Sequence, residues 1–145
     1  MSAGRIFTLE EANRTLPYVR RIAADLVRDY REWQETLAQY DLAAARRRAA
    51  ADGATVDDSE ATALEKRATA LAGAIEIYLA EIAAVGAEVK GFGEGLIDFP
   101  GELDGRAIRW CWMLGEPAIE HWHDSDSNFA GRQPITALAT TGGER

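Results

Sequence analysis

The sequence predicts an α+β fold, in which a long antiparallel hairpin of two coiled-coil-like helices has a small C-terminal three-stranded antiparallel sheet packed at its base. Two observations predict this fold. Before residue 86, apolar residues recur every 3.5 residues along two long stretches, which is the period of a helical seam. After residue 86, glycines divide short segments in which apolar and polar residues alternate, as they do in β-strands.

The first helical stretch begins near residue 8. Thr8 and Glu11 have the spacing of a capping box, in which each side chain bonds a backbone N–H group of the other residue. Pro17 removes one helical hydrogen bond, so we expect a kink or a short first helix there. We expect Gly53 to end the helix. The 3.5-residue repeat consists of Ala12, Leu16, Val19, Ala23, Leu26, Tyr30, Trp33, Leu37, Tyr40 and Ala44.

The second helical stretch follows a short polar link. Asp57 and Glu60 give a second capping-box signature, and Gly86 is placed to cap the C-terminal end. Two matching seams joined by a short link predict an antiparallel hairpin over about residues 8–86. The second repeat consists of Ala61, Leu64, Ala68, Leu71, Ile75, Tyr78, Ile82 and Val85.

The apolar surface is wider at the base of this hairpin than at the link. Ile22 and Val27 widen it on the first helix, and Ile77 and Leu79 widen it on the second. Because one partner helix cannot cover so wide a face, we expect the rest of the chain to pack there. The apolar face over residues 71–85 and the thin, alanine-rich arm also lead us to expect a homodimer.

The segment after the hairpin predicts a three-stranded meander over about residues 87–124. Strands are expected at about 96–99, 106–114 and 118–123. The pair Asp104-Gly105 is a strong signal for a tight hairpin turn, and Gly115-Glu116-Pro117 predicts a second turn. Residues 125–145 form a C-terminal extension, and we expect its last ten residues to be disordered.

The composition is that of one soluble domain. The chain has 145 residues, of which 47% are hydrophobic and 28% charged. The formal net charge of −8 argues against binding to nucleic acid or to an anionic membrane, because both need a basic surface. A single cysteine excludes an internal disulfide framework, and no apolar leader begins the chain. We therefore expect a cytoplasmic protein that binds neither nucleic acid nor membrane.

Five stretches carry a resemblance to a known family. In chain order they are FTLEEANRTLP, GLIDFPGELDGR, CWMLGE, WH and FAGRQPI. Together they resemble a bacterial family of small proteins known only as a domain of unknown function, number 2203. The resemblance covers residues 7 to about 135 and implies no mechanism, so no functional residue is carried over from it. His121 departs from the family's pattern, which usually has another aromatic residue before Trp-His.

The densest chemistry lies in CWMLGEPAIEHWHD, residues 111–124. One interpretation is a metal site made of Cys111, His121 and His123, with Glu116 or Asp98 as the acidic ligand. Nitrogen, sulfur and carboxylate donors suit a divalent ion such as zinc or iron.

The register of the predicted hairpin decides whether these side chains converge. If the numbers of facing residues sum to 232, Cys111 faces His121 and Arg109 faces His123, all on one face of the sheet. If they sum to 231, Cys111 lies opposite Glu120, and both histidines join the tryptophan face. A slip of one residue moves every side chain to the other face. Both registers are compatible with the sequence.

Other interpretations of the same residues remain open. A lone cysteine such as Cys111 is more often a small buried hydrophobe than a ligand, and tryptophans usually fill the core of a thin sheet. A polar, tryptophan-lined pocket where the sheet meets the hairpin would draw on Glu116, His123, Asp98, Arg132, Trp112 and Trp122.

Two classes of function follow from the sequence. The first is a protein that binds a small molecule or a metal ion in such a pocket, with or without catalysis. The second is a non-enzymatic interaction module that binds a protein partner through its helical arm. No GxSxG pattern or phosphate-binding loop points to a particular reaction.

Overall fold

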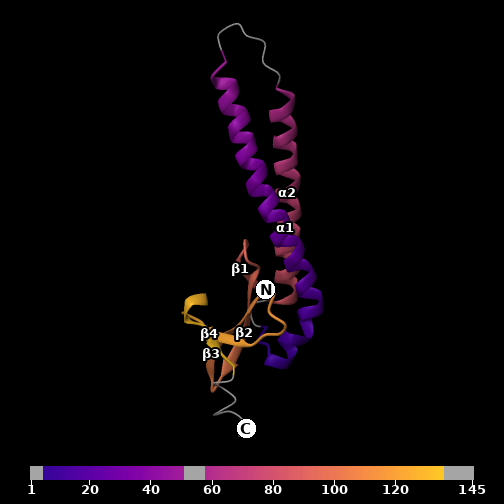
Figure 1. The fold of residues 1–145 in the computed structure, drawn as a ribbon. Coiled ribbons are helices and arrows are strands. Elements are labelled where there is room, and N and C mark those ends of the chain that lie inside the picture. The colour runs from indigo at the N-terminus through magenta and orange to yellow at the C-terminus, as the bar shows by residue number, and fades with distance from the viewer. Residues whose placement is uncertain (1–4, 51–57, 136–145) are drawn as a thin grey trace.

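The α+β architecture is confirmed by the computed structural model, which describes residues 5–50 and 58–135 (Figure 1). Two long helices pack side by side, and an antiparallel sheet lies at one end of the pair. The expectations for Gly53, Asp57 and the last ten residues lie outside the described residues. In chain order the elements are α1 (Leu9–Arg48), α2 (Ser59–Val85), β1 (Glu88–Gly91), β2 (Leu96–Leu103), β3 (Arg106–Met113), β4 (His121–Asp124), η1 (Phe129–Gly131, a 3₁₀ turn) and β5 (Gln133–Pro134).

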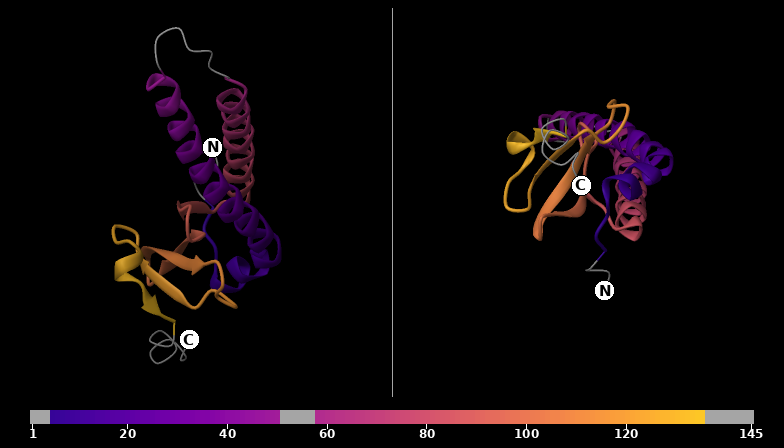
Figure 2. Two further views of the ribbon diagram at one scale, coloured as in Figure 1. Left: turned by 45° about the horizontal axis from the view of Figure 1, so that its top comes forward. Right: turned by 90° about the horizontal axis from the view of Figure 1, so that it is seen from below.

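Helix α1 begins as its sequence predicts. The Thr8 hydroxyl accepts from the N–H of Glu11 at 3.0 Å, and the Glu11 carboxylate accepts from the N–H of Thr8 at 2.9 Å. Pro17 lies inside the helix without splitting it into two. Figures 1 and 2 show the first turns of α1 bent out of line with the rest, as expected for a proline near the helix start. The helix ends at Arg48, before the end expected at Gly53, and its last three residues are arginines, which complement the helix dipole.

Helix α2 packs against α1 and ends at Gly86, which adopts a left-handed conformation with φ of 108°. The predicted repeat of α1 is buried from Ala12 to Leu26. Toward the link, Leu37 is exposed and Thr36 and Ala43 are buried instead, so the 3.5-residue seam does not hold along the whole helix.

A polar contact also joins the helices: Tyr78 on α2 donates a hydrogen bond of 2.7 Å to Asp29 Oδ2 on α1. The Arg28 guanidinium bonded to Asp29 lowers the pKa of that carboxyl, and the bond to Asp29 raises the pKa of the Tyr78 hydroxyl. Asp29 therefore stays ionised although it is buried.

The sheet has five antiparallel strands in the order β1-β2-β3-β4-β5, so the expectation of three strands was wrong. The two additional strands lie at the edges. β1 is four residues long, with a register shift between Val89 and Gly91, and β5 has only Gln133 and Pro134. Neither segment is long enough to display the alternation by which a strand is recognised in a sequence, and proline is tolerated at a sheet edge.

The register of β3 and β4 is the one in which facing residues sum to 232. Arg109 pairs with His123, and Cys111 pairs with His121. Asp104 and Gly105 both have positive φ, 52° and 75°, which is the conformation of the tight turn expected between β2 and β3.

One face of the sheet packs against the helices and forms the core. The core side chains on this face come from alternate positions of β2, β3 and β4. Figure 2 shows the helices on one side of the sheet and the rest of the hairpin extending beyond it. The sheet-side members of this core are Ile97, Phe99, Ile108, Trp110, Trp112 and Trp122.

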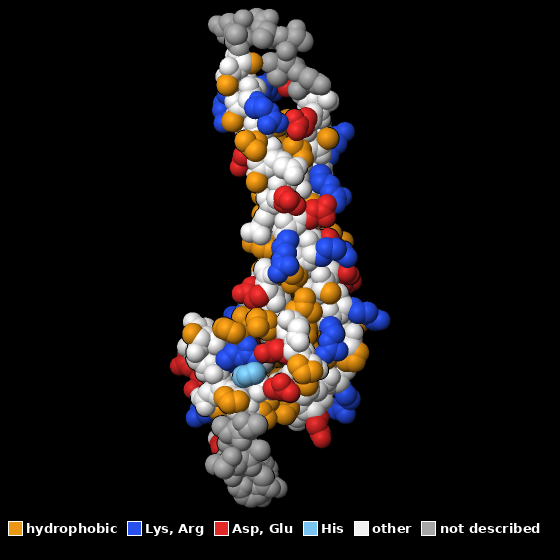
Figure 3. All heavy atoms as spheres, viewed as in Figure 1, with side chains coloured by type: hydrophobic (Ala, Val, Ile, Leu, Met, Phe, Trp, Pro, Cys, Tyr) orange, Lys and Arg blue, Asp and Glu red, His pale blue; other side chains and the backbone are white. Residues whose placement is uncertain are grey.

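Among residues 5–50 and 58–135, the rest of the chain covers only part of the wide apolar face at the hairpin base. Ile22 and Val27 are buried, whereas Ile77 on α2 is 60% exposed. Along the helical arm, acidic and basic side chains are interspersed on the face that Figure 3 presents.

Candidate metal centre

Three neighbouring strands each place one metal-ligating side chain on the sheet face that points away from the helices. Asp98 on β2 pairs directly with Cys111 on β3, and His123 on β4 is the diagonal neighbour of Cys111, whose direct partner is His121. The ligand atoms of Asp98, Cys111 and His123 all lie within 4.8 Å of one another, and all three residues are buried. Within residues 5–50 and 58–135, this is the group of three ligating residues that the fold brings together.

The hydrogen bonds of His123 fix which ring nitrogen carries hydrogen. Nδ1 lies 2.8 Å from the backbone carbonyl of Asp124. Because a carbonyl only accepts, Nδ1 is the donor in this contact. Nε2 lies 3.1 Å from Asp98 Oδ2. A neutral imidazole would thus turn a bare nitrogen lone pair toward a carboxylate oxygen. That contact is repulsive unless a proton or a cation lies there, and a backbone-anchored ring is the usual arrangement of a ligating histidine.

Asp98 is a costly residue to bury without a cation, whereas Cys111 is buried as a neutral thiol. Asp98 Oδ1 is buried and lacks a hydrogen-bond partner among the described residues. Burial raises the pKa of the Cys111 thiol to about 12, and the charge on Asp98 adds to that effect. A neutral thiol of this kind is a poor nucleophile. A bound divalent ion would favour the thiolate form of Cys111, because a thiol that coordinates a metal ion is deprotonated.

The dimensions of the cluster suit a small divalent ion. Bond lengths of about 2.0 Å to nitrogen or oxygen and about 2.3 Å to sulfur put tetrahedral ligand atoms about 3.3–3.8 Å apart. The ligand atoms lie within 4.8 Å of one another, so they need to approach by at most about 1 Å, which side-chain rotation in the three residues can supply. One nitrogen, one sulfur and one oxygen donor form a set that favours zinc or iron over magnesium or calcium.

Three other residues named from the sequence form a separate cluster. Arg132 donates to Glu116 Oε2 at 2.6 Å and also to Nδ1 of His121. The second oxygen of Glu116 accepts from the backbone N–H of Met113 at 2.9 Å. One nitrogen of Arg132 therefore bridges Glu116 and His121. The acidic residue beside Cys111 is Asp98.

The tryptophans do not line this cluster. Trp112 and Trp122 belong to the core on the opposite face of the sheet. The polar cluster accordingly lies on the outer face rather than where the sheet meets the hairpin. The indole N–H of Trp112 donates to the backbone carbonyl of Glu116 at 3.0 Å, which anchors the turn after β3.

A pocket of about 340 Å³ borders the cluster at Asp98. The sequence analysis missed its other lining residues, which come from β1, β2 and the segment around η1. No sequence motif marks them, because their convergence depends on the two edge strands. They are Lys90, Leu96, Asn128, Phe129 and Ala130.

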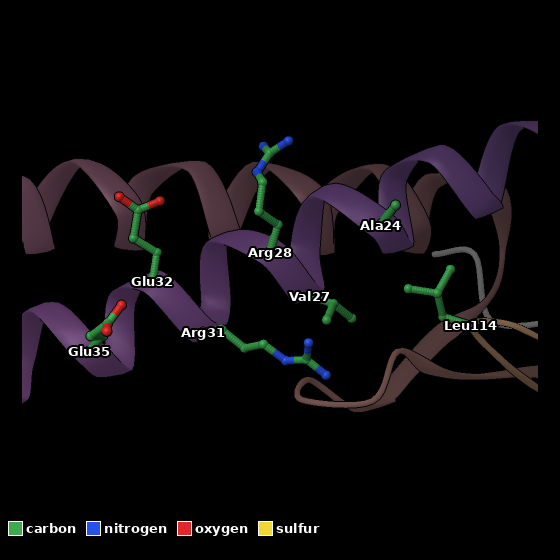
Figure 4. A pocket seen from close by; sticks show the side chains of 7 residues that line it. All are labelled: Ala24, Val27, Arg28, Arg31, Glu32, Glu35 and Leu114. Carbon is green, nitrogen blue, oxygen red and sulfur yellow. The ribbon is translucent and has the colours of Figure 1, made fainter.

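A second hollow of about 580 Å³ lies along α1, away from the cluster (Figure 4). Most of its charged side chains are already engaged. Arg28 pairs with Asp25 and Asp29, Arg31 donates to the carbonyl of Gly93, and Glu32 pairs with Arg67. This groove therefore offers less ligand-binding chemistry than the pocket beside Asp98.

A family model matches most of the chain. The model of a family described as an uncharacterized conserved protein, DUF2203, matches residues 5–135. No curated protein and no solved structure matches the chain. The match spans nearly the whole sequence, including α1, α2 and all five strands. The chain therefore belongs to the DUF2203 family.

Proposed function

We propose that this protein binds a divalent transition-metal ion, zinc or iron, through Asp98, Cys111 and His123. The observation that carries the proposal is the buried contact between Asp98 and His123 Nε2. Nδ1 already serves a backbone carbonyl, and Asp98 Oδ1 is unpartnered within the described residues. A bound cation would satisfy the ring nitrogen, the carboxylate and the thiolate together, whereas a proton satisfies only one contact.

The charges of the cluster support the same proposal. An ionised Asp98 and a Cys111 thiolate together neutralise a dication, so the buried site would carry no net charge when loaded. Arg109 beside His123 is paired with Glu88 at 3.1 Å, and Arg132 is paired with Glu116. Neither arginine is thus an unpaired positive charge that would repel the metal.

Elemental analysis and chelation test the proposal directly. Zinc-loaded protein is expected to contain about one equivalent per chain, and a chelator is expected to lower its melting temperature because only the folded state holds the ligands together. His123→Ala is expected to reduce the metal content to below about one tenth of an equivalent.

His121→Ala is the matched control. His121 lies on the same strand as His123, but its side chain contacts Arg132 and does not belong to the proposed metal site. It should keep the metal. Loss of metal in both variants would contradict the assignment of Asp98 as the third ligand, and metal-free wild-type protein after zinc supplementation would end the proposal.

A second candidate function, self-association through α2, is favoured by the surface of that helix. A window of 18 residues in α2 has a mean hydropathy of 1.6, yet only 22% of it is buried; by length and composition alone, such a helix could also cross a membrane. On the outer side of α2, small or apolar exposed residues follow alternating spacings of three and four. They are Ala70, Gly73, Ile77, Ala80 and Ala84. We propose that a second copy of the chain covers this face.

Light scattering at micromolar concentration tests this second candidate. The chain mass is 15.8 kDa, and the expected result is twice that mass for the wild-type protein. Ile77→Glu should yield the monomer mass, because a charge on this face opposes its burial. A wild-type monomer would contradict self-association, and association of α2 with neutral lipid vesicles instead of a second copy would replace it with membrane binding.

A further inference from the structure

We propose that the metal centre keeps one coordination position for an external ligand, and that this ligand is a carboxylate with an apolar body held in the pocket beside Asp98. The inference rests on the proposed metal binding and adds its ligand class. Three protein ligands are the number found in zinc sites that keep a fourth position for water or substrate, whereas structural zinc sites use four.

The pocket gives a ligand access to the centre. Asp98 is 1% exposed and is the member of the cluster that lines the pocket, so the buried donor atoms meet the open space at this residue. The remaining wall is formed by β1, by Leu96, and by the segment around η1 that follows β4. A volume of about 340 Å³ lies at the lower end of the range for small-molecule sites.

The edge strand β1 brings a positive charge into this wall. Its register against β2 shifts between Val89 and Gly91, which makes Lys90 the additional residue of a β-bulge. Bulges change the direction of a side chain and are frequent beside active sites. Lys90 lines the pocket, and its ammonium group lies 3.6 Å from Glu88 Oε2.

The pocket beside the loaded centre would present a positive charge to a ligand. Asp98 and Cys111 offset the dication. Glu88 is shared between Lys90 at 3.6 Å and Arg109 at 3.1 Å, and neither Glu88 nor Arg109 lines the pocket, so the charge that faces the pocket besides Asp98 is the ammonium group of Lys90. An anion that bonds the metal with one oxygen and approaches Lys90 with the other would balance it.

The apolar part of the wall defines the rest of the ligand. Leu96 follows the same face of β2 as Asp98, two residues away, and Phe129, which is 40% exposed, lines the pocket with Arg132 stacked on its ring at 4.6 Å. These two side chains fit a flat or branched hydrocarbon group attached to the carboxylate. The ligand class is therefore a small apolar carboxylate rather than a phosphate or a sugar, which would leave both side chains against polar groups.

Benzoate binding to cobalt-loaded protein tests the inference, because cobalt(II) in place of zinc has visible absorption bands that respond to a change in its ligands. Titration with benzoate is expected to change these bands in a saturable way. Benzyl alcohol, the neutral analogue of similar shape, is expected to leave them unchanged. Lys90→Met should weaken benzoate binding by about tenfold without changing the cobalt content.

The chain offers a matched control, since its only other lysine is Lys66 on α2, outside the pocket. Lys66→Met should bind benzoate like the wild-type protein. Cobalt binding without a response to benzoate, equal responses to benzoate and benzyl alcohol, or equal affinities in the two lysine variants would overturn the carboxylate assignment and leave metal binding intact. Failure of cobalt to bind at all would instead overturn the metal centre, and this inference with it.

Discussion

Replacing Asp98 with Asn is expected to lower the melting temperature in the presence of zinc but not in its absence. With zinc at about a thousand times its dissociation constant, binding adds about 4 kcal/mol to the stability of the wild-type protein. For a domain of this size, that gain corresponds to about 10 °C in melting temperature. Asp98→Asn removes one of three protein ligands, so the variant should lose most of this gain.

In the presence of a chelator, the same substitution removes a buried carboxylate that no metal ion compensates. The carboxylate of Asp98 is buried, one of its oxygens lacks a partner within the described residues, and the other faces His123 Nε2. An amide nitrogen in that place can donate to Nε2 and leaves no buried charge. The metal-free variant is therefore expected to melt at or above the temperature of the metal-free wild-type protein.

Differential scanning calorimetry of both proteins, with zinc and with chelator, measures the two effects. Glu102→Gln is the matched control, because Glu102 lies on the same strand and is exposed. It should behave like the wild-type protein under both conditions. If Asp98→Asn lowers the melting temperature equally with zinc and with chelator, then Asp98 stabilises the fold by itself and is no ligand.

The helical half of the molecule was predictable because its signals are local. The capping box of Thr8 and Glu11, the two helices and the left-handed Gly86 each depend on residues within a few turns of one another. The turn at Asp104 and Gly105 was predictable for the same reason. The edge strands were missed because two to four residues display no period, and their pairing is decided by partners far along the chain.

The types of residue in the candidate centre were predictable from the sequence, but which of the named residues form it was not. The sequence named Cys111, His121 and His123 as ligands, with Glu116 or Asp98 as the acidic ligand. The pairing of β2 with β3 and of β3 with β4 puts Asp98, Cys111 and His123 on one face of the sheet. The sequence was compatible with two registers of β3 and β4. What separates His121 and Glu116 from the cluster is Arg132, which follows η1 and lies outside the three strands expected from the sequence.

Position Lys90 illustrates the same limit. As the only lysine in the β-half it has no motif around it, and its place in the pocket wall depends on a bulge in β1. A bulge is set by the pairing of two strands, so a single sequence does not mark it. The residues that give the site its proposed ligand preference are thus the ones for which local sequence carries the least information.

Replacing Ile75 with Asp is expected to unfold the protein or to lower its melting temperature by more than about 10 °C. Ile75 is 7% exposed and belongs to the face of α2 that packs against α1. The substitution removes a buried branched side chain, which by itself costs about 2–5 kcal/mol, and places a carboxylate without a partner in the seam. Domains of this kind are stable by about 5–15 kcal/mol in total, so the loss is a large share of the whole.

Leu42→Asp is the matched control for this prediction, because Leu42 lies on the partner helix α1 and is 59% exposed. It should shift the melting temperature by less than about 2 °C, since a surface substitution away from the core changes stability little. Ile75→Val should fall between the two variants, at about 1 kcal/mol, because it creates only a small cavity. Circular dichroism against temperature measures all three. A melting temperature of Ile75→Asp close to that of Leu42→Asp would mean that the seam between α1 and α2 does not hold this fold together.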